Sequence, residues 1–408
     1  MMRRAARNTF FLSVSQIIAR LIGFFYFIFM ARVLGVEVFG VYNFTLAFIY
    51  NFIPVAGLGV ARLVLRDISR KRQKTNFYFP RLLPLCFFTS FGAYFLALLL
   101  GLILGQSLRQ IFYLAILGLF LIPNNLTYLI VSFRNAREKM GYMAIVNIVT
   151  PILIAVFGIV FVLMKLPLSF ILFAHVLGGA VVSLLLLNRA QSWGLAWGWV
   201  IDKKFWRYVF SQSWIFALLL ILAVFYLRLS VVLVGILKGA YFTGLYGSVF
   251  KFIEAIILVP QSLALALFPI SSKLLVNNKK RLAMIYKKGL GVLFLFSLPF
   301  SLVIIFFSRP ILRLAYGSEY LAAAPVFSLL GWALILFFVN VLPGNIILNS
   351  TKVKQFLPLA VLNLLLKLVF CLVLISRYSI LGAGWAVIGG EMVGLVINNL
   401  FVWKILKE

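Results

Sequence analysis

About twelve long apolar segments follow one another along the 408 residues of this chain. Hydrophobic residues make up 64% of the sequence and charged residues only 11%, so a soluble fold could not shield this much apolar surface from water. A helix that crosses a bilayer needs roughly 20 mostly apolar residues. We therefore predict an all-α polytopic membrane protein. Its helices are expected at about 10–34, 39–60, 82–104, 111–133, 142–164, 168–188, 209–236, 240–268, 289–307, 321–348, 357–376 and 382–403.

The formal charge of +30 would suggest a nucleic-acid partner in a soluble chain. Here the basic residues concentrate in short loops between the apolar segments, as the positive-inside rule describes. With the N-terminus in the cytoplasm, 27 of the 38 Lys and Arg residues fall on the cytoplasmic side, against 7 outside and 4 within helices. We expect a multi-pass protein of the cytoplasmic (inner) membrane with both termini cytoplasmic, the lipid bilayer as its partner, and no nucleic acid.

Short sequence matches recur in the same order in the two halves of the chain, at offsets of 204, 216 and 220 residues. The matched segments are Phe39–Tyr42 with Gly244–Tyr246, Ala144–Asn147 with Ala360–Asn363, and Pro123–Asn125 with Pro343–Asn345. They predict two pseudo-symmetric six-helix lobes around a central cavity, since a duplicated unit with an even number of helices keeps its topology. We expect lobes at 1–188 and 209–408, joined by a basic and aromatic cytoplasmic linker at 189–208.

Six ionisable residues fall within the apolar segments: Arg20, Arg228, Lys251, Glu254, Lys367 and Glu391. Such residues usually face a partner or a water-filled path, because a charge at a helix centre is costly. Lys251 and Glu254, three residues apart on one helix face, can form an internal ion pair, which does not exclude a place in the cavity wall. The balance of the six is +2, and surplus positive charge suits an anionic phosphate or pyrophosphate group.

Other residues of these segments leave two interpretations open. Pro54, Pro123, Pro260, Pro299 and Pro343 lie in mid-span and favour kinks, which suit a rocking transporter but also occur in static membrane proteins. Amides beside them could bind sugar hydroxyls, although hydrogen bonding between helices is the more common role. The single histidine, His175, is expected to pack or to form a hydrogen bond. The sequence contains no phosphate-binding GxxxxGK[ST] loop and no metal-ligand cluster, so we expect neither a cofactor nor an enzyme.

A family resemblance appears in three stretches. Ala31–Tyr42 resembles the "ARxLGxxxFGxY" turn of the polysaccharide-biosynthesis flippases, which belong to the multidrug/oligosaccharidyl-lipid/polysaccharide exporter superfamily. Gly244–Pro269 is similar to the counterpart of this turn in the second half of the family's fold, and Leu381–Ala386 to the opening of its last helix. The resemblance covers about residues 8–400. It implies two six-helix lobes around a V-shaped cavity flanked by the first, second, seventh and eighth helices.

The resemblance also implies an activity, the translocation of a polyprenyl-pyrophosphate-linked saccharide by alternating access. From the charges within the helices we expect Arg20, Arg228, Lys251 and Lys367 to contact the anion, and Glu254 and Glu391 to tune these cations or to carry a coupling proton. Glycosyltransferases or a polymerase of the same pathway would be its partners. The alternative is a cation-coupled exporter of soluble small molecules. Such exporters typically carry an Asp in the first helix, where this chain has Arg20. A membrane-embedded enzyme is disfavoured because the loop carboxylates are isolated.

Overall fold

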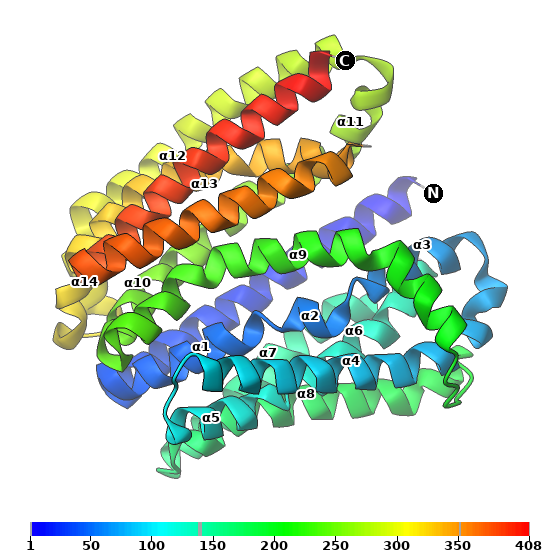
Figure 1. Cartoon of the computed structure of the whole chain (residues 1–408), viewed down its shortest axis with the longest axis horizontal. Helices are drawn as coiled ribbons and strands as arrows, with labels where there is room; N and C mark the ends of the chain where they lie inside the picture. The colour runs from blue at the N-terminus through cyan, green and yellow to red at the C-terminus, as the bar shows by residue number, and fades with distance from the viewer. Residues whose placement is uncertain (1, 138–140, 351, 408) are drawn as a thin grey trace. The chain divides into compact units, whose positions relative to one another are not determined.

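The computed structural model describes residues 2–137, 141–350 and 352–407, and these residues form helices and no strand (Figure 1). The α-helices run from the N-terminus to the predicted linker as α1 (Met2–Tyr50), α2 (Ile53–Gly57), α3 (Val60–Arg70), α4 (Thr75–Ile103), α5 (Leu108–Gly118), α6 (Leu121–Ala136), α7 (Gly141–Leu163) and α8 (Leu168–Ala190). They continue as α9 (Lys203–Lys238), α10 (Ala240–Ile256), α11 (Leu258–Asn277), α12 (Lys279–Ala315), α13 (Ala324–Asn349) and α14 (Val353–Lys407).

Ten helical stretches of the described residues are long and apolar enough to cross a bilayer. Two of them, Val14–Arg70 and Val353–Lys407, each contain a reversal of direction, at Gly35 and at Ser379 (Figure 1). Gly35 has φ +70°, a conformation that a residue without a Cβ adopts at little cost, and this explains the glycine in the turn. Each of the two stretches therefore supplies two crossings, in agreement with the twelve helices predicted. The chain is a multi-pass membrane protein.

The chain divides into two compact units, one formed by 1–26 and 45–224 and the other by 27–44 and 225–408. The second unit thus includes the turn at Gly35 together with the end of one arm of α1 and the start of the other. The predicted boundaries at 188 and 209 follow the repeat in the sequence, and they stay a prediction.

Three of the five prolines expected to kink helices lie just after breaks. α1 ends before Pro54, α5 and α6 are separate helices before Pro123, and α10 gives way to α11 before Pro260. A proline fits the first turn of a helix because no intrahelical partner exists there for a backbone N–H. Pro299 and Pro343 lie inside α12 and α13, and the non-helical residue of α12 is Phe307 rather than Pro299.

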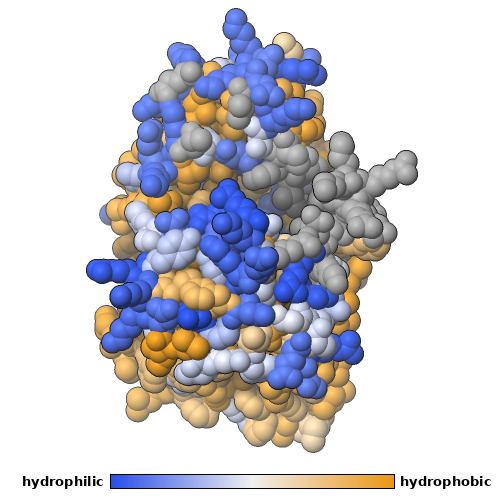
Figure 2. Space-filling view, turned by 90° about the vertical axis from the view of Figure 1, so that its right-hand side faces the viewer, coloured by the Kyte–Doolittle hydropathy of each residue, from blue (hydrophilic) through white to orange (hydrophobic). Residues whose placement is uncertain are grey.

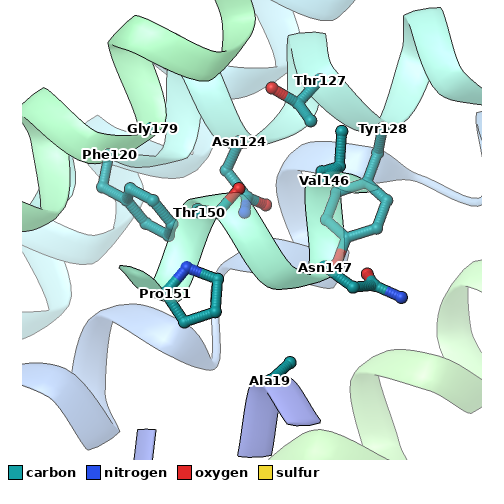
Figure 3. Close-up of a pocket in the computed structure, with 10 residues that line it drawn as sticks. All are labelled: Ala19, Phe120, Asn124, Thr127, Tyr128, Val146, Asn147, Thr150, Pro151 and Gly179. Carbon is teal, nitrogen blue, oxygen red and sulfur yellow. The ribbon is translucent and has the colours of Figure 1, made fainter. Parts of the chain in front are cut away.

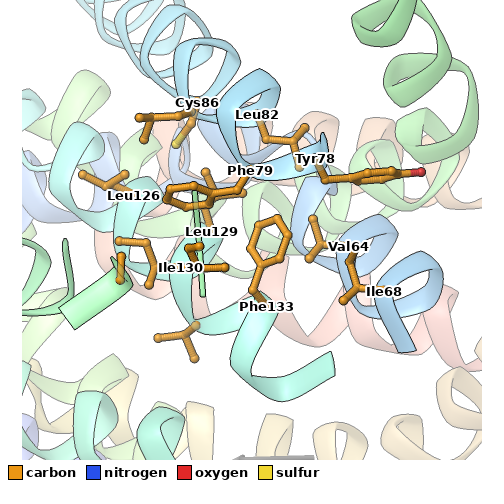
Figure 4. Packing of buried hydrophobic residues seen from close by; sticks show 14 of the residues in the cluster. Val64, Ile68, Tyr78, Phe79, Leu82, Cys86, Leu126, Leu129, Ile130 and Phe133 are labelled. Atoms are coloured by element: carbon orange, nitrogen blue, oxygen red, sulfur yellow. The ribbon is translucent and has the colours of Figure 1, made fainter. Parts of the chain in front are cut away.

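The core of the first unit lies between α3, α4 and α6 (Figure 4). Phe79 of α4 and Phe133 of α6 are fully buried, and their rings meet edge to face at a centroid distance of 5.5 Å. Val64 of α3 is equally buried beside them. A second cluster packs the starts of α12 and the ends of α13 and α14 in the other unit. Each unit therefore has a packed apolar core of its own, and the helices of these cores carry the polar residues described below.

Two structural pairs support the internal duplication. A Cβ on Gly40 of α1 would overlap the carbonyl of Ala240 in α10, and one on Gly244 of α10 would overlap the carbonyl of Val36 in α1. The 204-residue offset that relates Gly40 to Gly244 also relates Val36 to Ala240. The contact of Gly40 with Ala240 and the contact of Gly244 with Val36 are therefore equivalent in the two repeats. Only glycine allows the two backbones to approach this closely.

The second pair consists of Asn125 and Asn345, which are 220 residues apart. The amide of Asn125 donates to the carbonyl of Ala56 at 2.9 Å, and the amide of Asn345 donates to the carbonyl of Ala264 at 2.5 Å. Both carbonyls belong to the helix that follows a break, α2 in the first unit and α11 in the second. Each asparagine therefore secures an interrupted helix to its neighbour.

Candidate functional site

A cluster of three charged side chains joins α9 to α10 in the second unit. Lys251 Nζ lies 3.1 Å from Glu254 Oε2, and Arg228 Nη2 lies 3.7 Å from Glu254 Oε1. The expected ion pair at i, i+3 therefore forms, and Arg228 is added to it from the neighbouring helix. The side chains are 24%, 29% and 17% exposed for Arg228, Lys251 and Glu254. Two cations share one carboxylate, which leaves an accessible net charge of +1.

Lys251 also faces an aromatic ring. Its ammonium lies 5.0 Å from the centroid of Phe27, a residue of α1 in the same unit. Such a contact stabilises a cation that has lost part of its hydration, because the ring face carries negative charge density. The sequence identified Lys251 and Glu254 from their spacing, but it could not place Phe27 or Arg228 beside them.

Lys367 and Glu391 lie on the two arms of α14 and are far less accessible. Lys367 is fully buried, and its ammonium sits 3.8 Å from the ring centroid of Tyr226. Glu391 is 4% exposed and accepts a hydrogen bond from the amide of Asn340 at 2.8 Å. Lys367 is thus enclosed, whereas the sequence analysis treated it as a cation of the cavity wall. Its role as a substrate contact stays a prediction.

Several polar atoms around Glu391 have no hydrogen-bond partner among the described residues. They are Tyr226 Oη, Asn340 Oδ1, Asn363 Oδ1 and Lys367 Nζ. Unsatisfied buried groups in native proteins commonly mark bound water or an ion. The cluster therefore has the chemistry of a hydrated polar centre within the second unit.

Arg20 lies in the first unit, on the first arm of α1, and its side chain is exposed. The preceding residue, Ala19, lines the cavity described next. Arg20 is the charged residue that the sequence analysis placed in the first helix, and the structure keeps it on that helix.

A cavity of about 240 Å³ opens within the first unit between α1, α6, α7 and α8 (Figure 3). Asn124 and Thr150 point into it, as Figure 3 shows, with Phe120 on one side and Tyr128 on the other. The lining mixes polar and apolar residues and contains no charged side chain. The residues that form it are Ala19, Phe120, Asn124, Thr127, Tyr128, Val146, Asn147, Thr150, Pro151 and Gly179.

The sequence analysis did not single out this cavity. Its threonines are scattered through apolar runs, where such residues usually bond to their own helix. Asn124 was noted only as one of several amides beside prolines. A signal was available in the repeat, since Asn125 has a counterpart in Asn345 but Asn124 is replaced by Gly344.

His175 has the hydrogen-bonded role predicted for it. Its Nδ1 lies 2.9 Å from Tyr50 Oη, and its ring is in contact with those of Tyr26 and Phe120. The side chain is 4% exposed. His175 therefore supports the wall of the cavity through Phe120 rather than lining it.

Hydrophilic side chains gather at the end of the first unit where α3 and the start of α9 lie (Figure 2). Asp202, in the predicted linker, accepts hydrogen bonds from Arg81 Nε and from the backbone N–H of Phe205, both at 2.9 Å. These two contacts, the backbone one foremost, hold the pKa of Asp202 below its ordinary value. Trp206 donates to the carbonyl of Arg81 at 2.8 Å. Asp202 and Trp206 tie the linker to α4.

Two family models match this chain, and together they span residues 5–373. A family model described as "Polysaccharide biosynthesis protein" matches residues 5–275, and one described as "MatE" matches residues 216–373. A "Putative O-antigen transporter" from Shigella flexneri is 26% identical in an alignment of 386 residues that covers 88% of each chain.

Solved structures share the fold. "Inward-facing conformation of a multidrug resistance MATE family transporter of the MOP superfamily" matches with a TM-score of 0.78 and 13% identity, over 95% of this chain and 94% of that one. "Lipid II flippase MurJ, inward closed conformation" matches with a TM-score of 0.77 and 15% identity, over 96% and 87%. Since the first family model spans about two thirds of the sequence, this chain belongs to the polysaccharide biosynthesis protein family of the MOP superfamily and is a membrane transporter of that superfamily.

Proposed function

We propose that this protein is a flippase that moves a polyprenyl-pyrophosphate-linked oligosaccharide across the cytoplasmic membrane for cell-surface polysaccharide synthesis. It works by alternating access, with both termini in the cytoplasm. The lipid tail stays in the bilayer while the headgroup crosses. Glycosyltransferases and a polymerase of the same pathway supply and consume the lipid-linked saccharide.

The observation that carries this proposal is the cluster in which Glu254 is shared by Arg228 and Lys251. A carboxylate neutralises one cation, so one positive charge is left for a ligand within an apolar helix pair. All three side chains keep part of their surface exposed, which an anion needs for access. Arginine binds phosphate oxygens through two parallel N–H groups, while lysine acts as a point charge.

Arg20 is the proposed anion contact of the first unit. It is exposed in the membrane-spanning arm of α1, where a charge without a function would be costly. Lys367 is a further proposed anion contact, and Glu391 is proposed to tune it or to carry a coupling proton. Their enclosure makes them secondary to Arg20, Arg228 and Lys251.

The relatives support a lipid-linked substrate. The matching family model carries the description "Polysaccharide biosynthesis protein". The Shigella flexneri relative, a "Putative O-antigen transporter", covers 88% of this chain. One of the structures with the same fold is named as a lipid II flippase.

A cation-coupled exporter of soluble small molecules is the second candidate. It is favoured by the fold shared with a multidrug transporter and by the buried carboxylate of Glu391, which could bind a coupling cation. Against it, the accessible charges of the Arg228 cluster favour an anion over the organic cations that a carboxylate would attract.

One transport experiment separates these candidates. The purified protein is reconstituted into liposomes with a labelled polyprenyl-pyrophosphate oligosaccharide, and the label reached by an impermeant sugar-modifying enzyme is followed over time. Parallel liposomes contain a fluorescent organic cation and an imposed Na⁺ or H⁺ gradient. Exposure of the labelled saccharide without dye movement supports the flippase, whereas gradient-driven dye export without saccharide exposure contradicts it.

A further inference from the structure

We propose that the cavity of the first unit binds one uncharged sugar ring of the saccharide headgroup. This inference rests on the proposed function, and it adds a saccharide subsite to the cation contacts. The cavity, of about 240 Å³, lies wholly within one unit, between α1, α6, α7 and α8 (Figure 3).

The lining has the chemistry that a pyranose requires. A sugar ring carries hydroxyls around its rim and apolar C–H groups on its faces. Amide and hydroxyl groups, supplied here by Asn124, Thr127 and Thr150, both donate and accept hydrogen bonds. Phe120 and Tyr128 add aromatic surface for the apolar faces. No charged side chain is among the ten described residues that line the cavity, so an organic cation or a free phosphate would find no counter-charge there.

Polar atoms at the cavity are left without protein partners. The hydroxyl of Thr150 is buried and has no hydrogen-bond partner among the residues that the structure describes. The side-chain amide of Asn124 has no hydrogen bond to another described residue. The adjacent Asn125 is the opposite case, since its amide donates to the carbonyls of Ala56 and Cys86. An unsatisfied buried hydroxyl calls for a missing partner, and a ligand hydroxyl would provide one.

The internal duplication supplies a comparison that separates fold from function. The offset of 220 residues that pairs Asn125 with Asn345, and the offset of 216 that pairs Asn147 with Asn363, also relate the polar lining residues to positions in the second half. Four of those positions hold glycine or an apolar residue: Gly344 for Asn124, Ile347 for Thr127, Leu348 for Tyr128 and Leu366 for Thr150. The fifth polar lining residue, Asn147, keeps its amide in Asn363. The repeated fold therefore forms without the polar groups of these four residues, which favours a role specific to the first unit.

The cavity lies next to a proposed pyrophosphate contact. Ala19 lines it, and Arg20 follows Ala19 on the same helix, with a rise of about 1.5 Å per residue. In a polyprenyl-pyrophosphate saccharide the first sugar is bonded directly to the pyrophosphate. A sugar in the cavity would thus place its phosphates close to the arm of α1 that carries Arg20.

The test measures binding to the full-length protein in nanodiscs. The probes are polyprenyl pyrophosphate alone and the same lipid carrying one hexose, one N-acetylhexosamine or one 6-deoxyhexose. We expect the native protein to bind at least one sugar-bearing lipid about tenfold more tightly than the sugarless lipid, as two or three hydrogen bonds would provide.

Thr150→Val keeps the side-chain shape and removes the hydroxyl, and Asn124→Ala removes the amide. In either variant the preference should fall to about twofold or less while affinity for the sugarless lipid stays unchanged. Thr150→Ser should retain the preference. Ser183→Ala on α8 is the matched control, because the Ser183 hydroxyl bonds to its own helix at the Ala180 carbonyl.

Equal native affinity for all the probes would overturn the subsite and leave the proposed function standing. A preference that survives both substitutions, or a parallel loss of sugarless binding, would also overturn the subsite. Failure of the native protein to bind any of the lipids would contradict the proposed function itself, and the subsite with it.

Discussion

Glu254 holds Lys251 within 3.1 Å on the same face of α10, and it does so where both side chains are less than one third exposed. Removal of either partner would leave an unbalanced, partly buried charge in an apolar helix, which is costly. Neutralising one member of the pair should therefore lower the stability of the protein more than neutralising both would suggest, and a double variant can test this.

The first prediction concerns this pair. Lys251→Met and Glu254→Gln should each lower the thermal midpoint of the purified protein, while the double variant should lose less than the sum. We expect a coupling energy of about 1 kcal/mol from a double-mutant cycle. Additive losses would show that the two side chains do not interact in the membrane-spanning fold.

The second prediction concerns the close approach of α1 and α10. Gly40→Ala should place a methyl group on the carbonyl of Ala240, so we expect a loss of about 3 kcal/mol or more, or failure to accumulate folded protein. Gly92→Ala is the control, because a Cβ there meets no atom within 4 Å. Monodisperse elution and the thermal midpoint measure both variants. Equal behaviour of the two would contradict the crossing.

The third prediction separates structural amides from a ligand-binding amide. Asn125→Ala and Asn345→Ala should each destabilise the protein by about 1 to 2 kcal/mol, because each leaves a helix carbonyl without its donor. Asn124→Ala should change stability by less than about 0.5 kcal/mol, since its amide has no such bond. A larger loss for Asn124 than for Asn125 would reverse the assignment.

The fourth prediction follows from the pKa of Asp202, which the backbone N–H of Phe205 and the guanidinium of Arg81 lower. A lowered folded-state pKa contributes stability above the unfolded value and loses it as pH falls through the folded value. The thermal midpoint of native protein minus that of Asp202→Asn should therefore stay constant from neutral pH down to about 4 and shrink below it. A difference that grows on acidification would contradict this contact.

Much of the fold could be predicted because long apolar runs identify membrane-spanning helices. The turn at Gly35 and the repeat of Gly40 with Gly244 could be predicted for a different reason. Where the backbone requires glycine, the residue itself is visible in the sequence. The break before Pro123 was expected only as a kink. Whether a helix bends or breaks depends on which groups donate hydrogen bonds to the carbonyls that the break leaves unpaired, as the Asn125 amide does for the Ala56 carbonyl at the end of α2.

The candidate site could be predicted in part. The spacing of Lys251 and Glu254 fixes their contact, because three residues are nearly one helical turn. Arg228 and Tyr226 come from another helix, so their places beside Glu254 and Lys367 depend on packing that periodicity does not specify. The cavity at Thr150 was missed because a threonine facing a cavity and one facing its own backbone look the same in a sequence.

The central claim is that a lipid-linked saccharide crosses the membrane past Arg20 and the Arg228 cluster. Its most direct test is the flipping rate of a labelled polyprenyl-pyrophosphate oligosaccharide in liposomes that contain native protein, Arg20→Ala, or Arg109→Ala as a control cation outside the proposed site. The account predicts that exposure of the sugar to an external impermeant enzyme is fast with native protein and Arg109→Ala and falls to the protein-free rate with Arg20→Ala. Native-like flipping by folded Arg20→Ala would contradict the site, and no flipping by native protein would contradict the function.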